Sequence, residues 1–214
     1  MAEFEYEVDH VKHSVGGKGG HIFRRIFHIG MAAIPWLYYA HGETISDLLS
    51  LSSPVKVAAI LGMCVFIFEI MRIRFGILII GQREYEKHQF SALAWGAMSI
   101  ALTFVALSPW MGDDGTHAGW LAIPIILALT FGDPAMGEAR RMGLDSRTVF
   151  SIGTIVCGAT WLACGYFFGT PYWMALLMGP LTTAAEWPKL KWIDDNATMI
   201  LIPLASVLFL APFL

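Results

Sequence analysis

The chain has few charged residues and few cysteines. Of its 214 residues, 14% are charged, against about 25% in an ordinary soluble domain. Lysine and arginine together number 14 and do not exceed the 17 acidic residues, so the basic excess of a nucleic-acid-binding protein is absent. The three cysteines, Cys64, Cys157 and Cys164, lie inside apolar segments. They are expected to be small buried hydrophobic residues, because nothing supports a disulfide framework.

Apolar residues are abundant instead. They make up 56% of the chain, which excludes a disordered protein. A helix that crosses a bilayer needs roughly 20 mostly apolar residues. Seven segments predict an all-α fold, a polytopic transmembrane bundle of about seven spans, of which the fourth and sixth are short for a full crossing. The seven segments are residues 27–40, 55–71, 91–110, 120–132, 148–168, 172–185 and 198–214.

The basic residues fall on one side of these predicted spans. If the spans alternate in direction, the N-terminus shares one face with residues 72–90, 133–147 and 187–197, and Lys56 alone lies on the other face. This is the positive-inside pattern, so we expect a cytoplasmic N-terminus and an external C-terminus. The basic residues of the inner face are Lys12, Lys18, Arg24, Arg25, Arg72, Arg74, Arg83, Lys87, Arg140, Arg141, Arg147, Lys189 and Lys191.

The expected domain organisation is a cytoplasmic tail over residues 1–21 and one transmembrane catalytic domain over residues 22–214. The tail is acidic and then glycine-rich, and it has no apolar stretch of the kind found in a cleavable signal peptide. Residues 16–20 lack the GK[ST] sequence of a phosphate-binding P-loop. They are therefore predicted to form a flexible linker.

Four polar clusters lie on the predicted inner face, and the first contains His28. This histidine follows Arg24 by four residues and Arg25 by three, so a helix places all three side chains on one face. A titratable histidine that enters a membrane span is a candidate functional residue. The two arginines are also explained by membrane topology alone, and both interpretations remain open.

The second cluster combines a carboxylate with three arginines. Glu69 lies in an apolar segment, and Arg72 at the i+3 position is spaced to form an ion pair with it. Alternatively, Arg72 points into a cytoplasmic cavity together with Arg74 and Arg83 and binds phosphate. Arginine suits phosphate because its planar fork donates two parallel hydrogen bonds.

The third cluster begins at Asp133. Aspartate followed by Pro134 is typical of a helix start, with the aspartate as N-cap, and Gly143 is expected to end this short helix with Arg140 and Arg141 in its last turn. A helix N-terminus also attracts anions, and a carboxylate beside it is a candidate Mg²⁺ ligand.

The fourth cluster places Asp194, Asp195 and Asn196 at the start of the last span. Adjacent carboxylates repel each other unless a cation compensates, and such hard oxygen ligands suit Mg²⁺. Asn196 is alternatively the cap of the last helix. Carboxylates and arginines around one pocket are the groups that phosphoryl transfer uses.

The order of the clusters resembles the membrane-bound CTP-dependent lipid kinases, the family of dolichol kinase, phytol kinase and the CTP-dependent diacylglycerol kinase. Residues 24–28 match R-K-x-x-H, residues 83–86 match R-x-x-E, and residues 132–143 are similar to G-D-A-x-A followed by G-R-R-x-G. Glu186 and residues 194–198 match the C-terminal E and D-D-N-x-T. Arg25 and Pro134 depart from the pattern, and residues 147–151 lack the Glu and Gly of K-S-x-E-G. The likeness covers about residues 24–205.

This resemblance implies a transferase that moves the γ-phosphate of CTP to the hydroxyl of a lipid alcohol, a polyprenol first and a diacylglycerol-type lipid second. It implies that Asp133, Asp194 and Asp195 hold the Mg²⁺ of the nucleotide and that Asn196 assists. His28 or one of the carboxylates, with Asp133 and Asp195 foremost, would act on the hydroxyl. The residues implied in phosphate binding are Arg24, Arg25, Arg72, Arg83, Arg140 and Arg141.

Two other functions are weighed against this one. A cytidylyltransferase that makes a CDP-lipid would use similar groups, but a lipid phosphate would attack the α-phosphorus of CTP. A transporter would place charged residues deep in several spans, whereas Glu69 is nearly the only such candidate. The expected partners are the lipid in the bilayer, a nucleoside triphosphate and, in a homo-oligomer, a second copy of the chain.

Overall fold

The computed structural model describes residues 15–110 and 118–210, and over these residues every regular element is a helix. The all-α prediction is confirmed. The α-helices are α1 (Gly17–Gly30), α2 (Ala33–Leu48), α3 (Pro54–Phe75), α4 (Ala92–Leu107), α5 (Ala122–Arg141), α6 (Ser146–Phe168), α7 (Trp173–Ala185) and α8 (Asp195–Leu210). Three short 3₁₀ helices connect them: η1 (Glu84–His88), η2 (Ser108–Trp110) and η3 (Ala118–Leu121).

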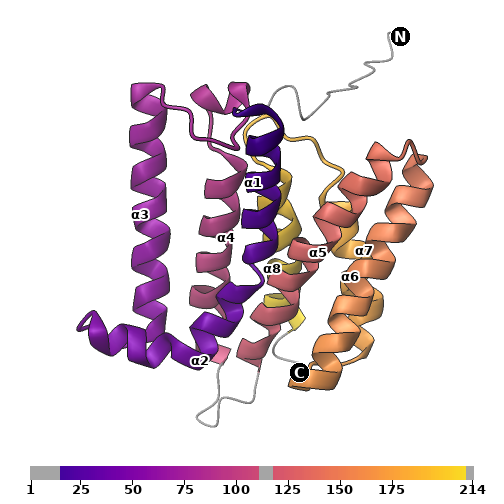
Figure 1. Ribbon diagram of the computed structural model, residues 1–214. Coiled ribbons are helices and arrows are strands. Elements are labelled where there is room, and N and C mark those ends of the chain that lie inside the picture. Colours follow the sequence, from indigo (N-terminus) through magenta and orange to yellow (C-terminus); the bar gives the residue numbers. More distant parts are fainter. Residues whose placement is uncertain (1–14, 111–117, 211–214) are drawn as a thin grey trace.

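The helices form an upright bundle in which α3 stands at one side and α6 and α7 at the other (Figure 1). From α3 onward, consecutive long helices run in opposite directions between the two ends of the bundle. The start of α1, the end of α3, η1, the end of α5 and the start of α8 all lie at the upper end. That end therefore gathers the segments that carry the four polar clusters.

Helix α5 lies at the centre of the core. Along its first half, Ala122, Ile125 and Ile126 are fully buried. Toward its upper half it approaches α6 closely, because a Cβ atom placed on Gly132 would come within 2.5 Å of Cys157 Sγ. Glycine at this position lets the two helices pack, and this close contact fixes the height of the next residue, Asp133.

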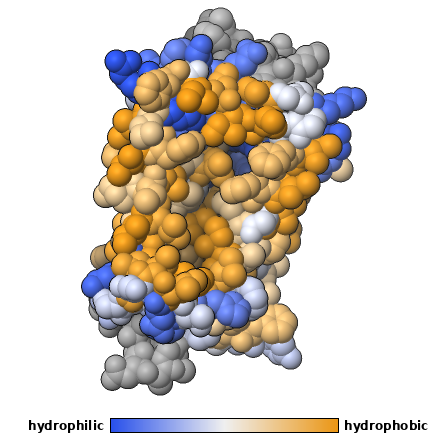
Figure 2. All heavy atoms as spheres, turned by 60° about the vertical axis from the view of Figure 1, so that its left-hand side comes forward, coloured by the Kyte–Doolittle hydropathy of each residue, from blue (hydrophilic) through white to orange (hydrophobic). Residues whose placement is uncertain are grey.

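Helices α3 and α6 are long and apolar enough to cross a membrane. The apolar helices α4, α7 and α8 are shorter. Only 17% of the most apolar window of α3 is buried, and Phe75 on this helix is 71% exposed. Figure 2 shows the corresponding face of the molecule: hydrophilic residues gather toward both ends, and apolar side chains cover a hollowed middle. Such a surface is costly in water and suits a lipid environment.

The first predicted span, residues 27–40, is wrong as a single helix. It is divided between α1 and α2, which meet at a turn at Met31 and Ala32. Pro35 explains the break, because proline has no backbone N–H and its ring collides with the carbonyl group four residues earlier.

Two local predictions are also wrong. Residues 17–20 form the first turn of α1 instead of a flexible linker, because Val15 and Gly81 pair through their backbones and hold this turn against residues 80–82. Asp133 does not cap a helix, since Pro134 lies inside the continuous helix α5. Gly143 ends α5 in a left-handed conformation, with φ 74°, as expected.

The other helix boundaries follow the predicted spans closely. The predicted segments 55–71, 148–168 and 172–185 correspond to α3, α6 and α7. Residues 91–110 form α4 and η2, whereas 120–132 is the first part of the longer α5. The last span begins three residues earlier than expected, at Asp195, and its residues 211–214 lie outside the described part of the chain, as does Lys12.

Candidate functional site

Arg72 forms a buried hub beneath the upper end of the bundle. Its guanidinium donates hydrogen bonds of 2.8 and 2.9 Å to the Glu69 carboxylate. It also donates to the backbone carbonyl oxygens of residues 77, 86 and 89, at 2.9, 2.7 and 2.7 Å. Both side chains are almost fully buried. The predicted i+3 ion pair is confirmed, and because the guanidinium is occupied by these acceptors, Arg72 positions residues 77–91 and does not face the candidate site.

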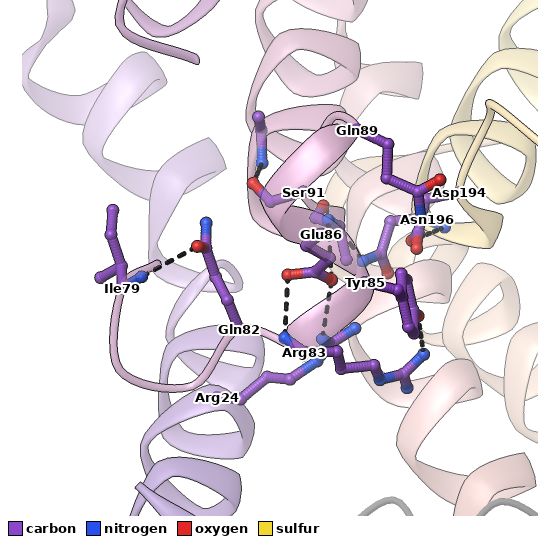
Figure 3. A network of polar contacts seen from close by, with 12 residues as sticks. Arg24, Ile79, Gln82, Arg83, Tyr85, Glu86, Gln89, Ser91, Asp194 and Asn196 are labelled. Carbon is purple, nitrogen blue, oxygen red and sulfur yellow. Dashed lines mark hydrogen bonds and ion pairs between the residues drawn. The ribbon is translucent and has the colours of Figure 1, made fainter. Parts of the chain in front are cut away.

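Glu86 ties three elements together above this hub. It is 1% exposed and accepts hydrogen bonds from the Arg24 side chain at 3.3 Å and from the backbone N–H groups of Arg83 and Ala92 at 3.2 and 3.4 Å. Figure 3 shows Arg24 of α1 and Arg83 reaching this carboxylate. The Arg83 guanidinium itself donates to the hydroxyl of Tyr85. Glu86 therefore holds two of the predicted phosphate-binding arginines in place.

His28 and Asp133 face each other across α1 and α5. Their Nε2 and Oδ2 atoms are 3.6 Å apart, and the same Nε2 lies 3.4 Å from the carbonyl oxygen of Leu129. Because Nε2 faces two acceptors, it carries the proton, and the lone pair of the neutral ring belongs to Nδ1. The structure thus brings two of the predicted catalytic residues together, and the contacts of Nε2 assign the acceptor role to Nδ1.

The Asp194–Asp195–Asn196 segment opens α8. Asp194 Oδ1 accepts the backbone N–H of Asn196 at 3.1 Å, so Asp194 caps the helix and the interpretation of Asn196 as its cap is wrong. Asn196 instead donates from Nδ2 to the carbonyl oxygen of Ala92 at 3.2 Å. Its Oδ1 is buried and has no hydrogen-bond partner in the described part of the chain, and the residue as a whole is only 5% exposed. The amide cannot be turned round, because Ala92 offers only an acceptor.

The two adjacent carboxylates share one negative charge near neutral pH. Burial and the neighbouring charge of Asp195 raise the pKa of Asp194 to about 8. Burial opposes ionisation of Asp195 too, but the hydrogen bond with Asp194 and the positive charges of Lys189, Arg83 and Arg24 bring its pKa below the usual range. Asp133 also interacts electrostatically with Asp195. The three predicted metal-binding carboxylates, one on α5 and two at the start of α8, therefore interact electrostatically.

A Mg²⁺ ion needs oxygen ligands, and the candidate ligands here are the carboxylates of Asp133, Asp194 and Asp195. Within residues 15–110 and 118–210, no three His, Cys, Asp or Glu side chains converge closely enough to enclose a metal ion. Mg²⁺, however, is usually held by one or two carboxylates together with water and substrate phosphates. Asp194 and Asp195 fit that smaller requirement, because a bound cation would relieve the repulsion that helps to raise the pKa of Asp194.

A second group of arginines lies at the end of α5. Arg25 and Arg141 both pair with Glu138, the former at 3.2 Å, and these two contacts hold the pKa of Glu138 down at about 2. Arg140 pairs with the buried Glu186, and its guanidinium lies over the Trp187 ring, 5.3 Å from the centroid. The sequence predicted these arginines but not their carboxylate partners.

One pocket opens between the start of α1, residues 79–82, α4 and α8. It is partly open to solvent, and its cavity volume of about 60 Å³ is smaller than the roughly 300 Å³ or more of a typical small-molecule site. Its polar lining includes Arg24, His28 and Asn196. Its apolar lining comes from Phe23, Phe27, Met31, Ile79, Ile80 and Leu93. The pocket therefore brings polar groups of the upper end together with apolar side chains, of which Phe23, Phe27 and Ile80 are exposed.

None of the known family models, curated proteins or solved structures compared with this chain matches it. The candidate site therefore stands on the order of the motifs and on its own geometry.

The shared proton of Asp194 predicts a pH-dependent stability. Between the ordinary aspartate pKa of 3.8 and about 8, the folded protein keeps a proton that the unfolded chain releases. The free energy of unfolding should therefore fall as the pH rises through this window. Asp194→Asn keeps an oxygen that accepts the Asn196 N–H but cannot titrate. Chemical denaturation without divalent ions should give the variant a flatter profile from about pH 5 to pH 8, and an unchanged slope would contradict the shared proton.

Proposed function

We propose that the protein is a membrane-embedded transferase that moves the γ-phosphate of CTP to the hydroxyl of a lipid alcohol. The observation that supports this most is the pocket that joins apolar helix surfaces to His28, the partner of Asp133, and to Asn196, which follows Asp194 and Asp195 in the sequence. An acceptor with an apolar tail could enter between the helices, while a charged nucleotide meets the arginines at the polar end. CTP and the choice of a polyprenol or diacylglycerol acceptor rest on the motif resemblance.

The proposal includes a membrane arrangement. The helices would cross the bilayer about seven times, with α1 and the first part of α2 forming the first crossing. The N-terminus and the polar end would face the cytoplasm, because the basic residues of the described chain cluster at the ends of α1, α3 and α5 that lie together in Figure 1. The nucleotide would then be taken directly from the cytoplasm.

The chain's own groups suffice to activate the hydroxyl. His28 Nδ1 would take the proton of the lipid hydroxyl as its oxygen attacks the γ-phosphorus. The bond from the γ-phosphorus to the bridging oxygen breaks, CDP leaves, and the phosphate remains on the lipid. Asp133, 3.6 Å from Nε2, would hold the ring orientation and stabilise the imidazolium that forms.

The charge of the transferred phosphate needs compensation. Arg24, which lines the pocket, and Arg83, whose backbone N–H bonds to the same Glu86 carboxylate, would contact phosphate oxygens. Arg25 of α1, together with Arg140 and Arg141 at the end of α5, would bind the remaining nucleotide phosphates. Asp194 and Asp195 would hold Mg²⁺, which neutralises phosphate charge when bound.

The cytidylyltransferase alternative is favoured by one observation, the number of arginines around the polar end, since a lipid phosphate acceptor would need additional cations. The two reactions transfer different parts of CTP. Membranes that contain the protein can therefore be incubated with Mg²⁺, mixed lipid alcohols and CTP labelled at either the α or the γ position. Label from γ alone in the lipid supports the kinase, label from α supports the cytidylyltransferase, and no transfer from any nucleotide would refute both.

His28→Gln tests the proposed base. Glutamine keeps a polar side chain but cannot accept the hydroxyl proton as a base, so kcat should fall by roughly 10²–10⁴. The KM for CTP should change little, because His28 does not contact the nucleotide in this proposal. His88→Gln, on the exposed end of η1, is the matched control and should keep wild-type kcat. A His28→Gln enzyme with near-normal kcat would remove His28 from the mechanism.

A further inference from the structure

Asn196, which lines the pocket beside His28, carries an acceptor atom with no hydrogen-bond partner among the described residues. Asn196 is only 5% exposed. Within the described residues, its side-chain oxygen Oδ1 is the acceptor that has no hydrogen-bond partner. Leaving a buried polar atom unpaired is costly, and proteins rarely do so without a ligand or water to complete the bond. The bond from Nδ2 to the Ala92 carbonyl oxygen fixes which atom of the amide remains unpaired.

The other side-chain acceptors that line the pocket are already hydrogen-bonded within the protein. Arg24 donates to Glu86, Glu86 also accepts two backbone N–H groups, and Gln82 accepts the Ile79 N–H at 2.9 Å. Among the described residues that line the pocket, two acceptors therefore remain for a ligand. One is Asn196 Oδ1, and the other is His28 Nδ1, because Nε2 carries the proton of the ring. A lipid with a single hydroxyl has only one proton to donate and can satisfy only one of them.

We propose that the pocket selects a lipid acceptor that carries a second hydrogen-bond donor next to its reacting hydroxyl, such as a vicinal diol or an amino alcohol. The reacting hydroxyl donates a hydrogen bond to His28 Nδ1, and the neighbouring donor donates one to Asn196 Oδ1. The aliphatic chain lies along Phe23, Phe27 and Leu93, which supply the apolar lining. This inference rests on the proposed function for the identity of the reacting hydroxyl. It departs from the single-hydroxyl lipids that the motif resemblance suggests.

The test is a binding measurement without nucleotide, so that it does not depend on catalysis. Purified protein in micelles is titrated with hexadecane vicinal diol or with hexadecanol, in competition with a fluorescent long-chain diol. The diol should bind about tenfold more tightly, the effect of one hydrogen bond worth about 1.4 kcal/mol. Equal affinities would overturn the proposal, because they would mean that water satisfies Asn196.

Asn196→Leu separates the donor effect from general lipid binding. This variant should bind the diol and hexadecanol with the same affinity, close to that of wild-type protein for hexadecanol. Ser206→Ala, on the same helix, is the control and should keep the tenfold preference, because Ser206 donates to the Ile202 carbonyl oxygen within α8 and does not line the pocket. A preference that survives in Asn196→Leu would also overturn the proposal.

The binding result and the transfer reaction can fail independently. A diol preference without phosphate transfer from any nucleotide would keep the pocket as a lipid site and refute the proposed kinase. Transfer from γ-labelled CTP to hexadecanol and to the diol alike, with equal binding of both, would keep the kinase and refute the selection by Asn196.

Discussion

Asp195→Asn is expected to abolish phosphate transfer while leaving the helical bundle intact. Asp195 is the partner that stays ionised in the carboxylate pair, because Asp194 retains their shared proton. The substitution keeps the shape of the side chain but removes the negative charge that would hold Mg²⁺. Losses of such electrostatic stabilisation typically cost about 10²–10³ in rate, and losing the metal costs more. Transfer of γ-label to lipid is the measurement.

The matched control is Asp145→Asn at the start of α6. It makes the same chemical change at the same end of the bundle, where Asp145 caps a helix and accepts the N–H groups of Arg147 and Thr148. Asparagine serves equally well as a helix cap, so this variant should keep full activity. Near-normal transfer by Asp195→Asn, or an equal loss in both variants, would refute the specific role of Asp195.

Arg72→Met should produce the largest loss of stability. It leaves the buried Glu69 carboxylate without its partner and removes the donors of three backbone carbonyl groups. Breaking a buried ion pair from one side typically costs about 3–5 kcal/mol, because the remaining charge stays buried. Since Arg72 holds residues 77–91 over the pocket, lipid binding should be lost as well. Thermal and denaturant unfolding in detergent give the measurement.

Arg74→Met is the control for Arg72→Met. Arg74 lies two residues farther along α3 and is exposed, so its loss should change stability by less than about 0.5 kcal/mol. Glu69→Gln combined with Arg72→Met should recover part of the lost stability, because no unpaired charge remains. Equal unfolding of the two single variants, or no recovery in the double variant, would contradict the account of this hub.

The helices were predictable because length and apolar content decide them. The apolar segments that became α3, α6 and α7 contain few residues that disfavour a helix, namely interior glycines and Pro180 in α7, and their apolar content outweighs these. The two prolines that misled the prediction acted in opposite ways: Pro35 ends a helix, whereas Pro134 is accommodated inside α5. Whether a helix continues through a proline depends on whether neighbouring groups compensate for the lost backbone hydrogen bond. The local sequence does not contain that information.

The candidate site was predictable only where its contacts are local. The spacing of Glu69 and Arg72 predicted their ion pair, but the same spacing could not show that Arg72 would use its other donors on distant carbonyl groups. Arg24 meets Glu86 across 62 residues, and Arg140 meets Glu186 across 46. Such pairings follow from helix packing, so the sequence identified arginines without their carboxylates. Glu86 in η1 and Glu186 at the end of α7 each lie beside an apolar segment. That position was the sequence signal that could have identified these two carboxylates as buried partners of arginine.

The missing hydrogen bond of Asn196 had no sequence signal. An asparagine after two aspartates suggests a metal ligand or a helix cap, and the structure gives the cap to Asp194. The Asn196 amide donates from Nδ2 to the Ala92 carbonyl oxygen, and its Oδ1 accepts no hydrogen bond from the described residues. Only the packing of α4 against α8 creates that situation.

The central claim is that this polar end transfers the terminal phosphate of CTP to a lipid hydroxyl. Phosphorus NMR of the purified protein with CTP, Mg²⁺ and a lipid alcohol follows every product at once. The account predicts CDP and a lipid phosphomonoester in equal amounts, and neither product with Asp195→Asn. Release of diphosphate with a CDP-lipid, or unchanged CTP with every lipid alcohol supplied, would contradict it.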